Sequence, residues 1–120
     1  MKDKRVLVVD DEVAIARLVA LIVGEMGCEV DTANNGAEAL QRISQNKPDL
    51  IILDLIMPVM TGEEVIQEVQ GNPDLADIPI VLLSTRPSAR GYRIDAFPVI
   101  AKPFEPAQVK ETVRSVLGEG

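Results

Sequence analysis

The stretch RVLVVDDE, residues 5–12, runs a short apolar segment directly into three consecutive carboxylates. Val6–Val9 is rich in β-branched residues and does not alternate with polar ones, as is typical of a strand buried on both faces. Neighbouring carboxylates disfavour each other's ionisation, so Asp10, Asp11 and Glu12 cost free energy together unless a cation or a shared proton compensates. A helix cap at a solvated loop start and a cation site are both open interpretations of this triplet.

Three further apolar runs have the character of Val6–Val9. They are Leu50–Leu53, Ile80–Leu83 and Val99–Ala101. A weaker run, Glu29–Thr32, alternates apolar with polar residues, as an edge strand does. The sequence therefore predicts five strands.

Helical patterns separate most of these strands. Apolar residues from Ile15 to Met26 recur at helical spacing, and Gly27 is placed to end that helix in a left-handed conformation. The other expected helices are Ala37–Gln45 with Asn35 as its cap, one opened by a Thr61–Glu64 capping box and ending near Gly71, and one starting around Pro106.

Strands that alternate with helices predict a doubly wound α/β fold, a parallel sheet with helices on both faces. At 120 residues, 47% of them apolar, the chain fits one domain over residues 1–120. In such sheets ligands bind beyond the carboxyl ends of the strands. The residues that directly follow each apolar run are therefore the candidates for a site.

Carboxylates dominate these positions. Asp10 and Asp11 follow the first strand, and Asp54 follows the third. Mg²⁺ prefers oxygen ligands and needs only one or two carboxylates from a protein, so a magnesium ion would account for this gathering of acidic residues.

Hydroxyl and ammonium groups complete the set of candidate site residues that follow the strands. Ser84 and Thr85 follow the fourth strand, and Lys102 follows the fifth. The Ser84 hydroxyl, the Thr85 backbone N–H and the Lys102 ammonium are suited to anionic oxygens. Together with a metal they match phosphoryl transfer, in which Asp54 would be the nucleophile.

The motifs VLVVDDE, LIILDLIMPVMTG, IVLLST and VIAKPF, in this order, resemble the receiver domain of two-component response regulators. The resemblance implies a flavodoxin-like five-stranded sheet of order 2-1-3-4-5. It implies Asp54 as the phosphoacceptor. It further implies that Mg²⁺ binds to Asp10, Asp11, Asp54 and the backbone carbonyl of Ile56.

The same resemblance assigns roles to the remaining site residues and to partners. Ser84 would be the switch hydroxyl, and Lys102 would pair with the acceptor and precede a cis peptide bond to Pro103. The phosphoryl donor would be a histidine kinase or a histidine phosphotransfer protein, and a downstream effector would read the result. Such a domain is a signalling phosphoacceptor that catalyses only its own phosphorylation and dephosphorylation.

Two features depart from the family pattern. Val99 stands where receivers carry an aromatic residue, for which Phe97 or Tyr92 would have to substitute. The segment Arg86–Pro98 is shorter than its counterpart by about one helical turn and contains Pro and Gly, which predicts a short or irregular fourth helix.

Three alternatives remain open on the sequence. A degenerate receiver would bind proteins without regard to phosphate. A haloacid-dehalogenase-like phosphatase would need a second Asp where Ile56 stands. An FMN-binding flavodoxin-like carrier would bring its phosphate to the loop occupied by Asp10 and Asp11, which would repel it.

The composition of the chain limits the kinds of binding partner and the cellular location that we expect. With 12 basic and 19 acidic residues the net charge is −7, so direct nucleic-acid binding is not expected. Cys28 is the single cysteine and is expected to be a small buried hydrophobe, and no histidine is present. We expect a cytoplasmic protein without membrane attachment, because Val13–Val23 is too short to span a bilayer and contains Arg17.

Overall fold

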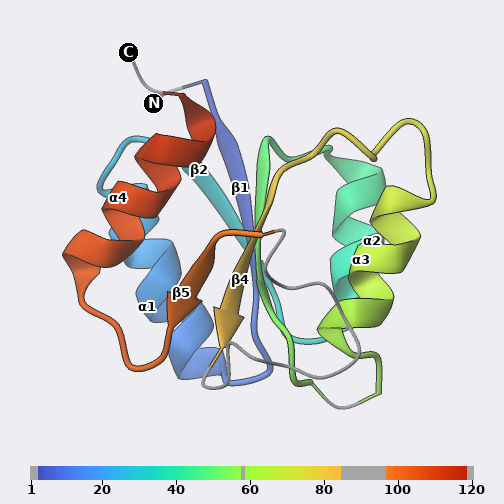
Figure 1. The fold of residues 1–120 in the computed structure, drawn as a ribbon, viewed down its shortest axis with the longest axis horizontal. Helices are drawn as coiled ribbons and strands as arrows, with labels where there is room; N and C mark the ends of the chain where they lie inside the picture. The colour runs from blue at the N-terminus through green and yellow to red at the C-terminus, as the bar shows by residue number, and fades with distance from the viewer. Residues whose placement is uncertain (1–2, 58, 85–96, 119–120) are drawn as a thin grey trace.

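The computed structural model describes residues 3–57, 59–84 and 97–118, and these form an open sheet between two layers of helices (Figure 1). The elements, in chain order, are β1 (Arg5–Val9), α1 (Val13–Gly24), β2 (Glu29–Ala33), α2 (Gly36–Gln45), β3 (Leu50–Asp54), α3 (Gly62–Gln70), β4 (Ile80–Ser84), β5 (Val99–Ala101) and α4 (Pro106–Leu117).

The sheet has five parallel strands in the order β2-β1-β3-β4-β5. The flavodoxin-like prediction is therefore confirmed, with β2 as an edge strand. Strands β3 and β4 each run one residue beyond the apolar run that predicts them, so that Asp54 and Ser84 are the last residues of their strands. The carboxyl ends of the strands thus carry the polar residues themselves.

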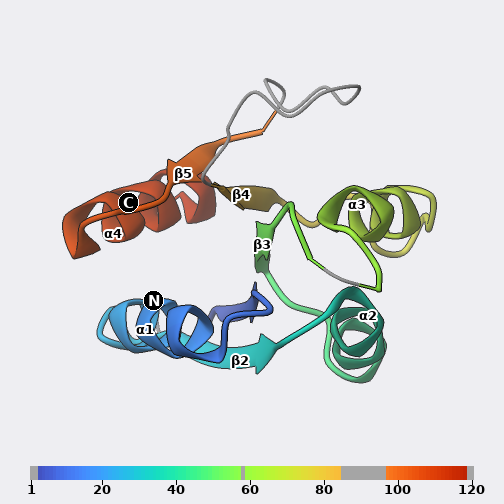
Figure 2. The ribbon, with the colours of Figure 1, turned by 90° about the horizontal axis from the view of Figure 1, so that it is seen from below.

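Helices cover both faces of the sheet, as predicted (Figure 2). Helices α1 and α4 lie on one face, where they pack on the side chains of residues such as Val8 and Ile52. Helices α2 and α3 lie on the other, over residues such as Leu7 and Leu53. Neighbouring strand residues point to opposite faces, so the unalternated runs supply both cores at once. Cys28 is a free, buried residue of the first core, as expected.

The predicted helix caps are mostly confirmed. The Asn35 side chain accepts a hydrogen bond from the Glu38 N–H at the start of α2, and Thr61 and Glu64 form a reciprocal capping box at the start of α3. The predicted end of the first helix is wrong, because α1 already ends at Gly24. Tight turns follow it, with the Met26 N–H bonded to the Val23 carbonyl. Gly27 does have a positive φ of 93°, but it lies after this turn and not at the helix end.

The prediction of a short fourth helix concerns residues 86–98 and lies outside the described residues except for Phe97 and Pro98. These two precede β5 and are not helical. Phe97 and Val99 both pack against the core beneath α2 and α3. The position expected to carry an aromatic therefore holds a partly buried valine, with Phe97 in the same cluster. Tyr92 is not among the described residues.

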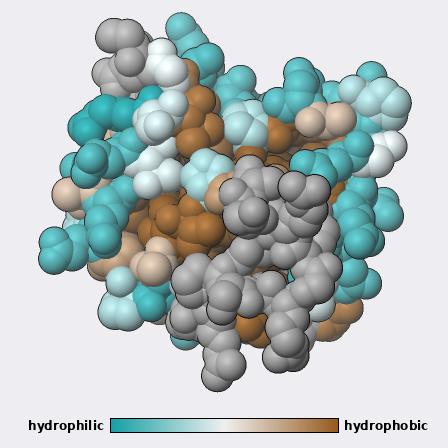
Figure 3. Space-filling model, viewed as in Figure 1, coloured by the Kyte–Doolittle hydropathy of each residue, from teal (hydrophilic) through white to brown (hydrophobic). Residues whose placement is uncertain are grey.

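The surface in Figure 3 is mostly hydrophilic along its outer margins, where α4 and α3 lie, with apolar residues between them. Among the residues that the structure describes, no helix has the length and apolar character needed to cross a membrane.

Candidate functional site

The carboxyl edge of the sheet concentrates buried polar groups. In the described part of the chain, the buried polar or charged residues are Asp10, Asp54 and Ser84, which are 0%, 5% and 1% exposed. Asp10 follows β1, and Asp54 and Ser84 end β3 and β4. Because burying a charge is costly unless it is paired, this edge demands a cationic partner.

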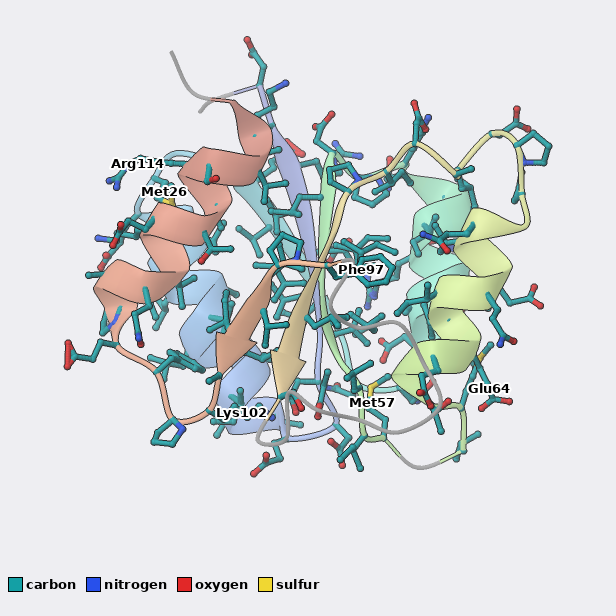
Figure 4. The ribbon with its side chains drawn as sticks, in the orientation of Figure 1. Met26, Met57, Glu64, Phe97, Lys102 and Arg114 are labelled. Carbon is teal, nitrogen blue, oxygen red and sulfur yellow. The ribbon has the colours of Figure 1, made fainter. Side chains whose placement is uncertain are left out.

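Lys102 supplies that cation from the end of β5 (Figure 4). Its Nζ lies 2.8 Å from Asp10 Oδ2 and 3.5 Å from Asp54 Oδ2, and its side chain is only 10% exposed. Its backbone N–H donates to the Ser84 carbonyl at 2.9 Å, which fixes the lysine beside β4. The peptide bond from Lys102 to Pro103 is cis, as expected. One ammonium therefore bridges carboxylates from two strands.

Backbone and side-chain donors hold Asp10 in place. Its Oδ1 accepts the Glu12 N–H at 2.9 Å, and its own N–H donates to the Ala33 carbonyl. The Asn34 side-chain amide donates to the Asp10 carbonyl at 3.1 Å. Sequence reasoning missed Asn34, whose only signal is its position directly after an edge strand.

Asp54 is held from two directions. Its Oδ1 accepts the Ile56 N–H at 3.2 Å. On the other side, Gly62 packs on its backbone: a Cβ at Gly62 would lie 2.5 Å from the Asp54 carbonyl oxygen and 2.7 Å from Leu55 Cα. The Gly62 N–H also donates to the Leu55 carbonyl at 3.0 Å. The glycine thus lets the start of α3 contact the end of β3.

The surroundings shift two pKa values at this edge. Burial, and then the neighbouring charge of Asp10, raise the pKa of Asp54 to about 6. Burial acts to lower the pKa of Lys102, but Asp10, Asp54 and Glu12 outweigh it and leave that pKa above its usual value. The lysine is therefore cationic, while Asp54 loses its proton at a higher pH than an ordinary aspartate does.

The residues fit a hard divalent cation. Oxygens of Asp10, Asp11 and Asp54 lie within 4.8 Å of one another. Asp10 Oδ2 is buried, and although Lys102 Nζ is near it, no described donor reaches it in hydrogen-bond geometry. Asp11 is exposed and leaves the cluster open to solvent on one side. An all-oxygen site with an open side matches the preference of Mg²⁺ for a few carboxylates and several waters.

Most of the predicted site residues converge. Asp10, Asp11, Asp54 and Lys102 form one cluster, and Ser84 ends the strand beside it. The other two predicted residues are Thr85 and Ile56. Thr85 lies outside the described residues. Ile56 contacts Asp54 through its N–H, and a metal contact through its carbonyl stays a prediction.

The sequence matches the family model described as the response regulator receiver domain over residues 6–114. The probable transcriptional regulator ycf27 of Pyropia yezoensis is 36% identical over 118 residues, covering 95% of this chain and 47% of that protein. The alkaline phosphatase synthesis transcriptional regulatory protein PhoP of Bacillus subtilis (strain 168) is 34% identical over 119 residues, covering 96% and 49%. The chain thus spans about half the length of the curated relatives it matches.

Two solved response regulators match this chain over nearly their whole length. The chemotaxis response regulator CheY4 of Vibrio cholerae has a TM-score of 0.86 and 35% identity, covering 94% of this chain and 98% of that one. The response regulator TrrA of Thermotoga maritima, solved in complex with Mg(2+)-BeF, has a TM-score of 0.83 and 36% identity with the same coverage. The chain therefore belongs to the response regulator receiver domain family.

Proposed function

We propose that the chain is a phosphorylation-dependent signalling switch. It accepts a phosphoryl group on Asp54 from a histidine kinase or histidine phosphotransfer protein, in a Mg²⁺-dependent reaction, and then changes its partner binding. One observation carries the proposal: the buried polar residues of the described chain gather at a single sheet edge, around one lysine whose side chain is 10% exposed. An ion pair with a purely structural role needs one acidic and one basic side chain. This edge holds two buried carboxylates, a buried hydroxyl residue and the lysine.

The chemistry assigned to Asp54 is in-line attack. One oxygen of the ionised carboxylate forms a bond to phosphorus while the bond from phosphorus to the donor's imidazole nitrogen breaks, and that nitrogen takes up a proton from the solvent. A bound Mg²⁺ supplies positive charge to the phosphoryl oxygens. The Ile56 N–H bond to Asp54 Oδ1 orients the carboxylate before the donor arrives.

We propose that the new phosphoryl group is contacted by Lys102, Ser84 and Thr85. The Lys102 ammonium already contacts Asp54 and is kept cationic by its acidic neighbours. The Ser84 hydroxyl and the Thr85 N–H are donors at the end of the fourth apolar run. Reversing a two-state population from 1:99 to 99:1 takes about 5.5 kcal/mol of differential interaction, which a few charge-assisted hydrogen bonds supply.

The relatives support a Mg²⁺-dependent phosphoryl chemistry, and some of them are longer proteins that regulate transcription. TrrA is solved with Mg(2+)-BeF, and the ycf27 and PhoP relatives are transcriptional regulators about twice as long as this chain. We propose that residues 1–120 act as one receiver domain that signals to a downstream effector protein or domain. With a net charge of −7, this domain itself is not proposed to contact nucleic acid directly.

A phosphate-independent binding module is the second candidate, and Val99 favours it. This residue, partly buried in the core beneath α2 and α3, stands in the position that the resemblance assigns to an aromatic. The two candidates share a fold and differ only in whether Asp54 is chemically active.

Measuring the intact mass of the protein after incubation with Mg²⁺ and acetyl phosphate distinguishes the two candidate functions. The expected result is one phosphoryl adduct on the unchanged chain, none on Asp54→Asn, and an undiminished adduct on Asp74→Asn, which makes the same chemical change at an exposed aspartate. An unmodified chain under conditions where Mg²⁺ binding is confirmed would favour the binding module.

A further inference from the structure

Hydrogen bonds fix the loop after β1 on both sides of Asp11. The Asp10 carbonyl, in the peptide unit before Asp11, accepts a hydrogen bond from the Asn34 side-chain amide at 3.1 Å. The Glu12 N–H, in the peptide unit after Asp11, donates to Asp10 Oδ1 at 2.9 Å. Each peptide unit is planar, so two held units set the direction in which the Asp11 side chain leaves the backbone. The backbone of this loop therefore orients the Asp11 carboxylate.

The Asp11 carboxylate depends on that backbone, because no described cation is paired with it. The described carboxylates paired with Lys102 are those of Asp10, Glu12 and Asp54. Asp11 is exposed, and yet one of its oxygens lies within 4.8 Å of oxygens of Asp10 and Asp54. Mg²⁺ demands nearly ideal octahedral geometry, so a ligand that is free to turn away would bind it less well.

Asn34 is itself held by α2. Its backbone N–H donates to Glu38 Oε1 at 2.8 Å, and Glu38 Oε2 accepts a hydrogen bond from Arg42 Nη2 at 3.2 Å. Arg42 lies one turn further along α2, and its Nη1 is 3.3 Å from Asp31 Oδ1 on β2. The hydrogen bond from the Asn34 N–H holds the pKa of Glu38 below its usual value, which favours the charged carboxylate. The Asn34 backbone is thus fixed while its side chain reaches the Asp10 carbonyl.

We propose that Asn34 is a positioning residue for Mg²⁺ binding, because its side-chain amide holds the Asp10 carbonyl and thereby aims the Asp11 carboxylate at the metal. Glu38 in turn keeps Asn34 in place. This role rests on the Mg²⁺ site of the proposed function. A neutral amide suits it, because the amide holds the carbonyl without adding charge beside the cation. Asp11 needs this support more than Asp10 and Asp54 do, since those two residues are buried.

A purely structural role for Asn34 would be limited to satisfying the Asp10 carbonyl. Asp10 is fully buried, and a buried carbonyl without a donor lowers the stability of the fold. Loss of the donor would then lower the melting temperature and leave the Mg²⁺ affinity of the folded chain unchanged. A positioning role predicts weaker Mg²⁺ binding as well. The two roles therefore differ in a property that can be measured on the folded protein.

Isothermal titration calorimetry with MgCl₂ tests the proposal on Asn34→Ala. The variant is expected to bind Mg²⁺ about tenfold more weakly than the unchanged chain, which is a common effect of removing a group that orients a metal ligand. In phosphorylation by acetyl phosphate, the Mg²⁺ concentration at half the maximal rate should rise by the same factor. The rate at saturating Mg²⁺ should change little, because Asp54 and Lys102 are untouched.

Asn72→Ala is the matched control. The Asn72 side chain also bonds a backbone group, since its Oδ1 accepts the Asp74 N–H at 2.9 Å. It lies between α3 and β4, at the opposite edge of the sheet from the metal site. Its Mg²⁺ affinity should equal that of the unchanged chain.

A double-mutant cycle tests whether Asn34 acts through Asp11. If the amide orients that carboxylate, its removal should have little effect once the carboxylate is gone. In an Asp11→Ala background, Asn34→Ala is therefore expected to weaken Mg²⁺ binding by less than about twofold.

Glu38 provides a second test, which leaves the Asp10 carbonyl with its donor. Glu38→Gln and Glu38→Ala remove the same charge, but only glutamine retains an acceptor for the Asn34 N–H. Glu38→Ala is expected to bind Mg²⁺ at least about twofold more weakly than Glu38→Gln. This pair decides the matter if a melting curve without Mg²⁺ shows that Asn34→Ala does not fold.

Three results would overturn the proposal. They are equal Mg²⁺ affinities of Asn34→Ala and the unchanged chain, an undiminished effect of Asn34→Ala in the Asp11→Ala background, and equal affinities of the two Glu38 variants. An unchanged chain that binds no Mg²⁺ would overturn it together with the metal dependence of the proposed function. If Mg²⁺ binding falls as expected in a chain that takes up no phosphoryl group, the positioning role stands and the proposed function alone is contradicted.

Discussion

The two edges of the sheet carry the same kinds of charged residue in different surroundings. At the amino edge, Arg5 pairs with Glu29 at 2.6 Å, and Lys47 pairs with Asp77 at 3.3 Å. The side chains of these four residues are 37–79% exposed. At the carboxyl edge, Lys102 and its two buried carboxylates are at most 10% exposed.

Burial decides what these charges do. When an exposed ion pair forms, each charged group gives up part of its hydration for the contact with its partner. The net contribution to the stability of the fold is therefore small, usually about 0–1 kcal/mol. Buried charges have lost their hydration and depend on one another, so changing any one of them is felt by the rest. Reactivity is therefore expected at the carboxyl edge, where the balance of charge can be altered by a metal or a phosphoryl group. The amino edge should tolerate change.

The largest expected effect is that of Lys102→Met, which leaves Asp10 and Asp54 buried without their ammonium. Without metal at about pH 7.5, the free energy of unfolding should fall by about 3–5 kcal/mol, as measured by urea denaturation. Added Mg²⁺ should recover part of the loss, because a cation then neutralises the carboxylates. A loss no larger than that of Lys47→Met would contradict the contrast between the edges.

Magnesium itself should stabilise the unchanged chain. At a free concentration about 100 times the dissociation constant, a ligand that binds only the folded state adds about 2.7 kcal/mol to the free energy of unfolding. Asp11→Asn should weaken this response without harming the fold, because Asp11 is exposed; Asp3→Asn is the matched control. Equal Mg²⁺ titrations of melting temperature for both variants would argue against Asp11 as a ligand.

Asp54→Asn should stabilise the metal-free chain by about 1–2 kcal/mol at about pH 7.5. The folded-state pKa of about 6 lies above the ordinary 3.8, so between these pH values the folded chain binds more protons than the unfolded one. The unchanged chain therefore loses stability as pH rises through this window, and the variant does not. Urea denaturation from about pH 4 to 8 should show the two diverging; parallel curves would mean that Asp54 ionises normally.

The smallest effect is expected at the amino edge. Lys47→Met should change the free energy of unfolding by less than about 1 kcal/mol, and added salt should shrink the difference further. Urea denaturation at low and high salt measures both. A large, salt-insensitive loss would show that exposure is not what distinguishes the edges.

Much of the fold was predictable because four of the five strands contain a continuous apolar run and each helix has local signals. The Asn35 cap and the Thr61–Glu64 box depend on residues three apart, so they can be recognised without knowing the fold. The end of α1 could not be placed in the same way. Gly27 has the residue type of a helix stop, whereas the chain leaves the helix at Gly24 and turns towards β2.

The sequence predicted which residues belong to the site, but it did not predict their burial or the distances between them. Strand ends place Asp10, Asp54 and Lys102 at one edge, but only the packing of distant segments determines that both carboxylates are buried and that one lysine reaches them. Asn34 and Gly62 act through backbone contacts with the two aspartates. An amide after a strand or a glycine at the start of a helix gives no sign of such contacts until the fold is known.

The strand order also has a consequence for synthesis. Strands β2, β1 and β3 are neighbours in the sheet and all lie before Leu55, with α1 and α2 to cover the two faces. A nascent chain can therefore assemble three of the five strands before β4 leaves the ribosome. Asp10 and Asp54 meet among these three strands, whereas Lys102 is translated 48 residues after Asp54. During translation the paired carboxylates must rely on protons or solution cations until their lysine arrives.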